Sequence, residues 1–131
     1  MNLSKLNLAP TKKPTARNAV TSRRQSILRS VEKQIYVCEQ IEEGASDVYD
    51  PRTGRKQSTW FWLDDSGSYL LSIKYGKIEL ELAKGKYSVV CEDITDVKNS
   101  LNIVKDEIQR GEFDTALERH SKEIRKNFNR S

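Results

Sequence analysis

The stretch from Trp60 to Cys91 constrains the fold most strongly, because it consists of short apolar runs separated by turn residues. Residues 69–75 and 77–82 place large apolar side chains at every second position. That period is typical of β-strands with one buried face. Gly67 and Gly76 supply the positive φ angles that tight hairpin turns need. We therefore predict a four- to five-stranded antiparallel meander in this stretch.

The first run of the predicted meander has large apolar residues on both faces, so its buried face is not determined by the pattern. Trp60 and Trp62 fall on one side of a strand, and Phe61 and Leu63 fall on the other. One interpretation is that the Trp pair fills the core under a helix. The other is that the pair forms an exposed surface for base stacking or for a protein partner.

Apolar residues recur at three- and four-residue spacing on both sides of the predicted sheet, which predicts helices there. The first helix is expected to run from a cap at Thr21-Ser22 to about Glu43 and to end at Gly44. Two more are expected after the sheet. The predicted fold class is α+β, with an N-terminal helix, the meander, and two C-terminal helices packed on one face. A second copy would cover the other face, which makes a homodimer an expectation as well.

Positive charge is concentrated at the N-terminus. The chain has a net charge of +4, but residues 1–30 contain seven Lys and Arg and no Asp or Glu, so the remainder is net acidic. We expect residues 1–22 to form a disordered basic arm and residues 23–131 to form a single α+β domain. Such an arm either attracts polyanions or serves as a solubilising tail.

Residues that carry chemistry are few. The only histidine, His120, falls on the apolar side of the last predicted helix, where packing is the usual role. Cys38 and Cys91 stand in apolar patterns, which predicts buried free thiols in a reducing, cytoplasmic compartment. No phosphate-binding glycine loop, nucleophile motif or zinc-ligand spacing occurs. We therefore expect a non-enzymatic protein without metal, cofactor or membrane segment.

The basic arm, the Arg-rich helix start and the basic turn at residues 52–56 favour a nucleic-acid-binding protein, in particular one for single-stranded DNA. Cations would contact phosphates, and an aromatic side chain would stack on bases. The turn at 52–56 is equally compatible with a merely solvated loop. The predicted interface comprises Lys12, Lys13, Arg17, Arg23, Arg24, Arg52, Arg55, Lys56, Trp60, Trp62 and Tyr75.

A second hypothesis assigns the function to the acidic side of the sheet. Glu79 and Glu81 alternate with apolar residues and therefore share one strand face. That face would dock on a basic surface of a host protein complex, and the chain would act as a small regulator or inhibitor.

Residues 75–86 read Y-G-K-I-E-L-E-L-A-K-G-K, and a strand, a helix ending near Gly111 and a final basic helix are expected to follow. This pattern resembles a family of small uncharacterised bacterial and prophage proteins. The resemblance implies a phage or mobile-element setting and no particular activity. In outline, a meander followed by a helix also resembles the coactivator and Whirly-type folds that bind single-stranded DNA, which is an analogy of fold alone.

Overall fold

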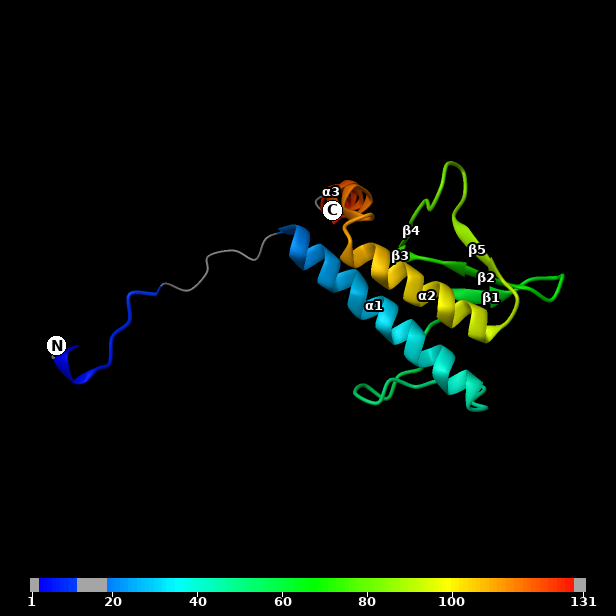
Figure 1. The fold of residues 1–131 in the computed structure, drawn as a ribbon, viewed down its shortest axis with the longest axis horizontal. Coiled ribbons are helices and arrows are strands. Elements are labelled where there is room, and N and C mark those ends of the chain that lie inside the picture. Colours follow the sequence, from blue (N-terminus) through cyan, green and yellow to red (C-terminus); the bar gives the residue numbers. More distant parts are fainter. Residues whose placement is uncertain (1–2, 12–18, 129–131) are drawn as a thin grey trace.

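The structure, a computed structural model, describes residues 3–11 and 19–128. It confirms the α+β class, with one long N-terminal helix, antiparallel strands and two C-terminal helices (Figure 1). The elements are η1 (Leu3–Lys5), α1 (Ala19–Glu42), β1 (Phe61–Leu63), β2 (Tyr69–Ser72), β3 (Lys74–Tyr75), β4 (Ile78–Glu79), β5 (Ser88–Cys91), α2 (Ile94–Gln109) and α3 (Asp114–Phe128).

Helix α1 begins at Ala19, earlier than the predicted cap, and ends where the sequence predicts. Gly44 has a φ of 103°, and its N–H donates to the carbonyl of Ile41. The N–H of Ala45 donates to the carbonyl of Gln40. These two bonds form the Schellman arrangement, in which a left-handed residue satisfies the last helical carbonyls. A glycine is favoured at this position because a Cβ would strain the positive φ.

Helices α1 and α2 run antiparallel, side by side, and form one layer of the fold (Figure 1). Ion pairs at both ends of the contact reflect this direction, since Lys98 lies 3.4 Å from Glu42 and Lys105 lies 3.5 Å from Glu32. At the start of α2 the carboxylate of Asp93 accepts from the backbone N–H of Asp96, which caps the helix.

The strands form two sheets rather than one meander. β2 pairs antiparallel with both β1 and β5, and β3 pairs with β4 in a separate hairpin. The predicted run 69–75 is therefore divided at Ile73, whose carbonyl accepts from the N–H of Leu80. Both of these side chains are fully buried. Burying them turns the hairpin away from the sheet, and β5 takes the place beside β2 that the meander would give to the third strand.

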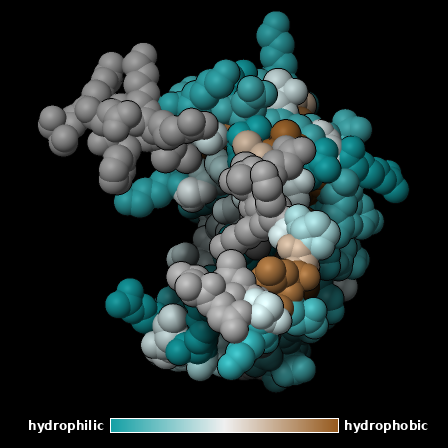
Figure 2. All heavy atoms as spheres, turned by 90° about the vertical axis from the view of Figure 1, so that its left-hand side faces the viewer, coloured by the Kyte–Doolittle hydropathy of each residue, from teal (hydrophilic) through white to brown (hydrophobic). Residues whose placement is uncertain are grey.

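The basic turn at residues 52–56 is closed by a single bridge that joins Tyr49 to Lys56. The next strand, β1, begins only at Phe61. The intervening segment folds back beside α1 on the side opposite α2 (Figure 1). No helix within the described ranges 3–11 and 19–128 has the length and hydropathy of a bilayer span. Figure 2 shows the left-hand side of Figure 1, where the surface is mostly hydrophilic with small hydrophobic patches.

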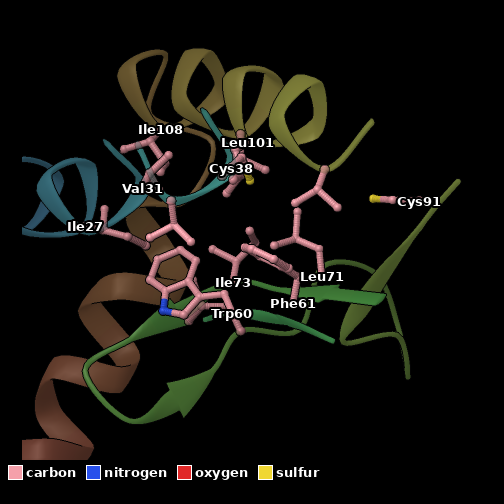
Figure 3. Close-up of a cluster of buried hydrophobic side chains, with 14 of the residues drawn as sticks. Ile27, Val31, Cys38, Trp60, Phe61, Leu71, Ile73, Cys91, Leu101 and Ile108 are labelled. Carbon is pink, nitrogen blue, oxygen red and sulfur yellow. The ribbon is translucent and has the colours of Figure 1, made fainter. Parts of the chain in front are cut away.

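The core lies between the helical layer and the sheet (Figure 3). Trp60 is 8% exposed and Phe61 is 5% exposed, and both point into this core. Trp62, two residues after Trp60, is 45% exposed on the other side of the sheet. Trp60 lies in a bend just before β1, where its carbonyl still accepts from the N–H of Ser72, and the alternation of faces does not extend back to its side chain. One tryptophan is therefore core and the other is surface.

Helix α3 is fastened to α1 by an ion pair. Nε of Arg24 donates to Oδ1 of Asp114 at 2.8 Å, and Nη2 of Arg24 donates to Oδ2 of the same carboxylate. The guanidinium lies over Gly111, where an added Cβ would come within 2.7 Å of it. This arrangement connects the end of α2, the start of α3 and the N-terminal half of α1.

Candidate nucleic-acid interface

An open groove runs between the middle of α1 and the loop at residues 50–57. It consists of two adjoining hollows of about 360 and 630 Å³, which share Arg29, Lys33 and Asp50. Arg52 lines the larger hollow, and Tyr36 lines the smaller one. The full lining consists of Ser26, Arg29, Ser30, Glu32, Lys33, Tyr36, Asp50, Pro51, Arg52 and Gln57. We call this feature the basic groove.

The loop wall of the groove is held in place by local hydrogen bonds. Oδ1 of Asp50 accepts from the backbone N–H of Arg52 at 2.8 Å. The carbonyl of Asp50 accepts from the N–H of Gly54, whose φ is 70°. An aspartate that bonds to the backbone two residues further on is a typical turn-forming device. These hydrogen bonds fix the Asp50-Pro51 turn and keep the backbone of Arg52 at the groove.

Gln34 ties the loop segment to α1. Its side chain is 4% exposed, and its Nε2 donates to the carbonyl of Ser58 at 3.0 Å. Its Oε1 accepts from the backbone N–H of Trp60 at 3.0 Å. Both groups of the amide are satisfied, as a buried polar side chain requires. This double bridge anchors the segment that follows the 50–57 loop to α1, at the residue next to Lys33.

The electrostatics of the groove favour an anion. Among the described residues, no salt bridge involves Arg29, Lys33 or Arg52. The two acidic residues in the lining have partners of their own. Glu32 pairs with Lys105 of α2, and Asp50 accepts bonds within the turn and from Gln57. Three cations thus remain available for phosphate groups.

Two of the predicted phosphate contacts are engaged elsewhere. Arg24 is committed to Asp114, and this hydrogen-bonded carboxylate raises the pKa of the guanidinium further. Lys56 lies 3.0 Å from Asp47 at the surface. Arg24 is therefore a structural residue here, and the charge of Lys56 is partly balanced. Arg23 is partly buried on α1, and Arg55 is exposed at the turn.

The predicted aromatic contacts lie apart from the groove. Trp60 is buried in the core, so its ring has no face for a base, and the prediction that it stacks is wrong. Trp62 is exposed on the outer face of the sheet, and Tyr75 packs against the core from β3. The predicted arm contacts Lys12, Lys13 and Arg17 lie outside the described residues.

Sequence reasoning missed Arg29, Lys33 and Tyr36 as members of one site. Arg29 and Lys33 are four residues apart, so they share a helix face, but such a face looks like ordinary solvated surface. Only the return of the 50–57 loop to α1 brings Arg52 opposite them. The signal that was present is the order of charge along α1, basic at its start and acidic at its end, which opposes the helix dipole.

The acidic pair of the second hypothesis has partners within the chain. Glu79 on β4 stands opposite Lys74 of β3. Glu81 accepts a hydrogen bond of 2.9 Å from the hydroxyl of Tyr87, and this bond raises the tyrosine pKa. Both glutamates are exposed. The two glutamates therefore lie on a solvated surface of the hairpin region, with Lys74 opposite Glu79 in the register.

Buried thiols do not contribute to the groove. Burial raises the pKa of Cys38 to about 12 and also raises the pKa of Cys91, which keeps both thiols protonated at neutral pH. Across the described part of the chain, no three His, Cys, Asp or Glu side chains gather as a metal site would require. His120 contacts Glu123 on its own helix.

Comparisons of the chain with protein-family models, with curated proteins and with solved structures find no match. The resemblance carried by residues 75–86 therefore stays a prediction. In the structure these residues form the β3–β4 hairpin and the turn after it, where Ala83 bridges to Lys86.

Proposed function

We propose that this protein is a non-enzymatic binder of single-stranded nucleic acid, and that the basic groove receives the phosphate backbone. The observation that carries the proposal is the convergence of Arg29, Lys33 and Arg52 in one groove without ionic partners among the described residues. Cations that neutralise phosphates release condensed counterions, and this release drives binding. The basic arm adds to the same attraction over a longer range.

A single strand suits this groove better than a duplex. The site is concave and lies between a helix and a loop, whereas duplex readers project an element into a DNA groove. Tyr36 lines the same hollow as Arg29 and Lys33. Bases of a single strand are free to stack on such a ring, and each stacked base contributes about 1–3 kcal/mol. Tyr36 replaces Trp60 as the proposed stacking residue.

The proposed setting is the cytoplasm of a bacterium or of a cell carrying a mobile element. Two free, buried cysteines support a reducing compartment. The resemblance of residues 75–86 to prophage proteins supports the mobile-element setting. The alternative function, a host protein partner bound through Glu79 and Glu81, has less support because Glu81 is hydrogen-bonded to Tyr87 and Glu79 stands opposite Lys74 in the strand register.

The test is fluorescence anisotropy of a labelled oligothymidylate titrated with the full chain at low salt. We expect micromolar binding, and we expect Arg29→Glu/Lys33→Glu to weaken it at least about tenfold, because two phosphate contacts become repulsive. The matched control is Lys77→Glu/Lys84→Glu, which makes the same charge change at exposed sites on the hairpin side.

Two results would contradict the proposal. One is an absence of binding by the wild-type chain at low salt. The other is an equal loss of affinity in the groove variant and the control variant, since that would reflect net charge rather than a site. The alternative would be favoured if the chain binds a host protein but not DNA, and if Glu79→Lys/Glu81→Lys abolishes that binding.

A further inference from the structure

The outer face of the β1–β2–β5 sheet carries an apolar row. The strand register places Trp62 opposite Leu70 and Leu70 opposite Val90. Trp62 is 45% exposed, Val90 is 70% exposed and Leu70 is partly exposed. Their neighbours Phe61 and Leu71 point the other way, into the core (Figure 3). The three side chains form one cross-strand line on the surface, which we call the outer row.

Helices cover the inner face of this sheet, whereas in the described part of the chain Trp62 and Val90 of the outer row stay exposed. Strands β1, β2 and β5 contain no charged residue at all. The solvent-facing side of an antiparallel sheet usually carries polar residues. A contiguous uncharged apolar surface of this kind marks an interaction site.

We propose that the outer row is the interface at which two copies of this chain pair. A surface without charge selects a partner surface without charge, and a second copy offers the same one. The row is also self-complementary in size, with bulky Trp62 at one edge strand, Leu70 at the centre and small Val90 at the other edge strand. A two-fold axis along β2 places each Trp62 over the partner's Val90. Symmetric pairing of identical patches is the commonest mode of oligomer formation.

The size of the row sets the strength of the pairing. A standard interface buries about 800 Å² on each partner, and three side chains supply only the centre of such an area. The dimer is therefore in equilibrium with the monomer in the micromolar range. Two sheets packed face to face lie about 10 Å apart, which leaves room for the interdigitated side chains. The basic groove is lined by α1 and the 50–57 loop and by none of the strands that carry the outer row, so this pairing leaves it open in both copies.

The test is sedimentation velocity of the full chain between about 1 and 200 µM, a range that brackets micromolar pairing. We expect the wild type to shift from the chain mass of 15.1 kDa toward twice that mass. Val90→Arg places a charge in the row and is expected to weaken pairing at least about tenfold, since an unpaired charge would be buried. The matched control is Ile103→Arg on α2, where the side chain is 63% exposed, and we expect it to pair like the wild type.

Circular dichroism and thermal unfolding verify that each variant is folded. If Val90→Arg fails to fold, Trp62→Gln provides the second variant with the same expected loss of pairing. Sedimentation at the chain mass throughout the concentration range would overturn the proposal, as would a Val90→Arg variant that pairs like the wild type. A monomeric protein whose oligonucleotide affinity falls with Trp62→Gln would assign the outer row to bases instead.

Discussion

The basic groove and the outer row differ in how they would hold a partner. The groove presents Arg29, Lys33 and Arg52 without ionic partners among the described residues, whereas the outer row presents three apolar side chains on strands without a single charge. Binding by the first is expected to weaken with salt, because exposed charges are screened. Pairing by the second is expected to persist in salt, because it depends on apolar burial. The two proposed recognition surfaces thus differ in chemistry and are built from different elements of the fold.

The largest expected effect comes from Trp60, which supports both surfaces. Its backbone N–H bonds to Gln34 beside the groove, and its ring fills the core under the sheet. Trp60→Ala is expected to cost about 3–5 kcal/mol in the free energy of unfolding, because it leaves a cavity. Trp62→Ala is the control and is expected to cost less than about 1 kcal/mol, as at most surface positions. Urea unfolding of both variants at concentrations where the chain is monomeric measures the difference, and equal costs would place both rings in similar surroundings.

A smaller effect, confined to one surface, is expected from Gln34→Ala. The change leaves the carbonyl of Ser58 and the N–H of Trp60 without their side-chain partner. The N–H of Trp60 is buried, and an unsatisfied buried group costs about 1–3 kcal/mol, whereas Ser58 is exposed and its carbonyl can bond to water. We expect lower stability and weaker oligonucleotide binding, because the groove walls are no longer fixed, while pairing of copies stays unchanged by sedimentation. A folded Gln34→Ala protein with wild-type affinity would show that the bridge does not position the groove.

The affinity for single strands is also expected to depend on oligonucleotide length. Two paired copies carry two grooves, so a strand long enough to reach both gains affinity from the second, intramolecular contact. Val90→Arg is expected to weaken binding to such a strand by about tenfold or more and to leave binding to a short strand unchanged. Anisotropy titrations with the two oligonucleotide lengths measure the affinity of the wild type and of Val90→Arg for each strand. Equal effects on both lengths would mean that Val90 acts through the groove and not through pairing.

The smallest expected effect concerns the ion pair that lies outside both surfaces. The hydrogen bonds from Arg24 hold the pKa of Asp114 below its ordinary value. A lowered folded-state pKa stabilises the fold above the unfolded pKa of about 3.9, and the contribution is lost as pH falls through the lower value. Asp114→Asn is expected to lower the melting temperature slightly at pH 7. The difference from wild type should shrink below about pH 4, and a difference that stays constant down to pH 2 would contradict this role.

The sequence predicts those features that depend on local periodicity. The stripe of α1, its end at Gly44 and the burial of Leu71 and Ile73 agree with the structure, whereas Ser72 between them is buried too and breaks the expected alternation. Periodicity does not say which strand lies beside which, because pairing is decided by tertiary packing. The burial of Ile73 and Leu80 diverts the β3–β4 hairpin, and β5 then joins β2. The outer row exists only because of that pairing.

The candidate site was predictable in part. The basic turn pointed to Arg52, and the run of arginines pointed to the start of α1. Arg29, Lys33 and Tyr36 were not identified as a group, since their partner in the groove is separated from them by a loop whose path the sequence does not reveal. Arg24 was misassigned because its partner Asp114 is 90 residues away in the chain. Charge alone does not distinguish a cation that is paired in the fold from one that is free for a ligand.

The most direct test of the central claim is the salt dependence of oligonucleotide affinity for the wild type and for Arg29→Gln/Lys33→Gln. Each phosphate contact with a single strand contributes about 0.7 to the slope of log affinity against log salt. The three groove cations therefore predict a wild-type slope of about −2 or steeper, and the double variant should be shallower by about 1.4. Sedimentation confirms that the variant pairs like the wild type. A wild-type slope near zero, or equal slopes for the two proteins, would contradict a groove that binds phosphates.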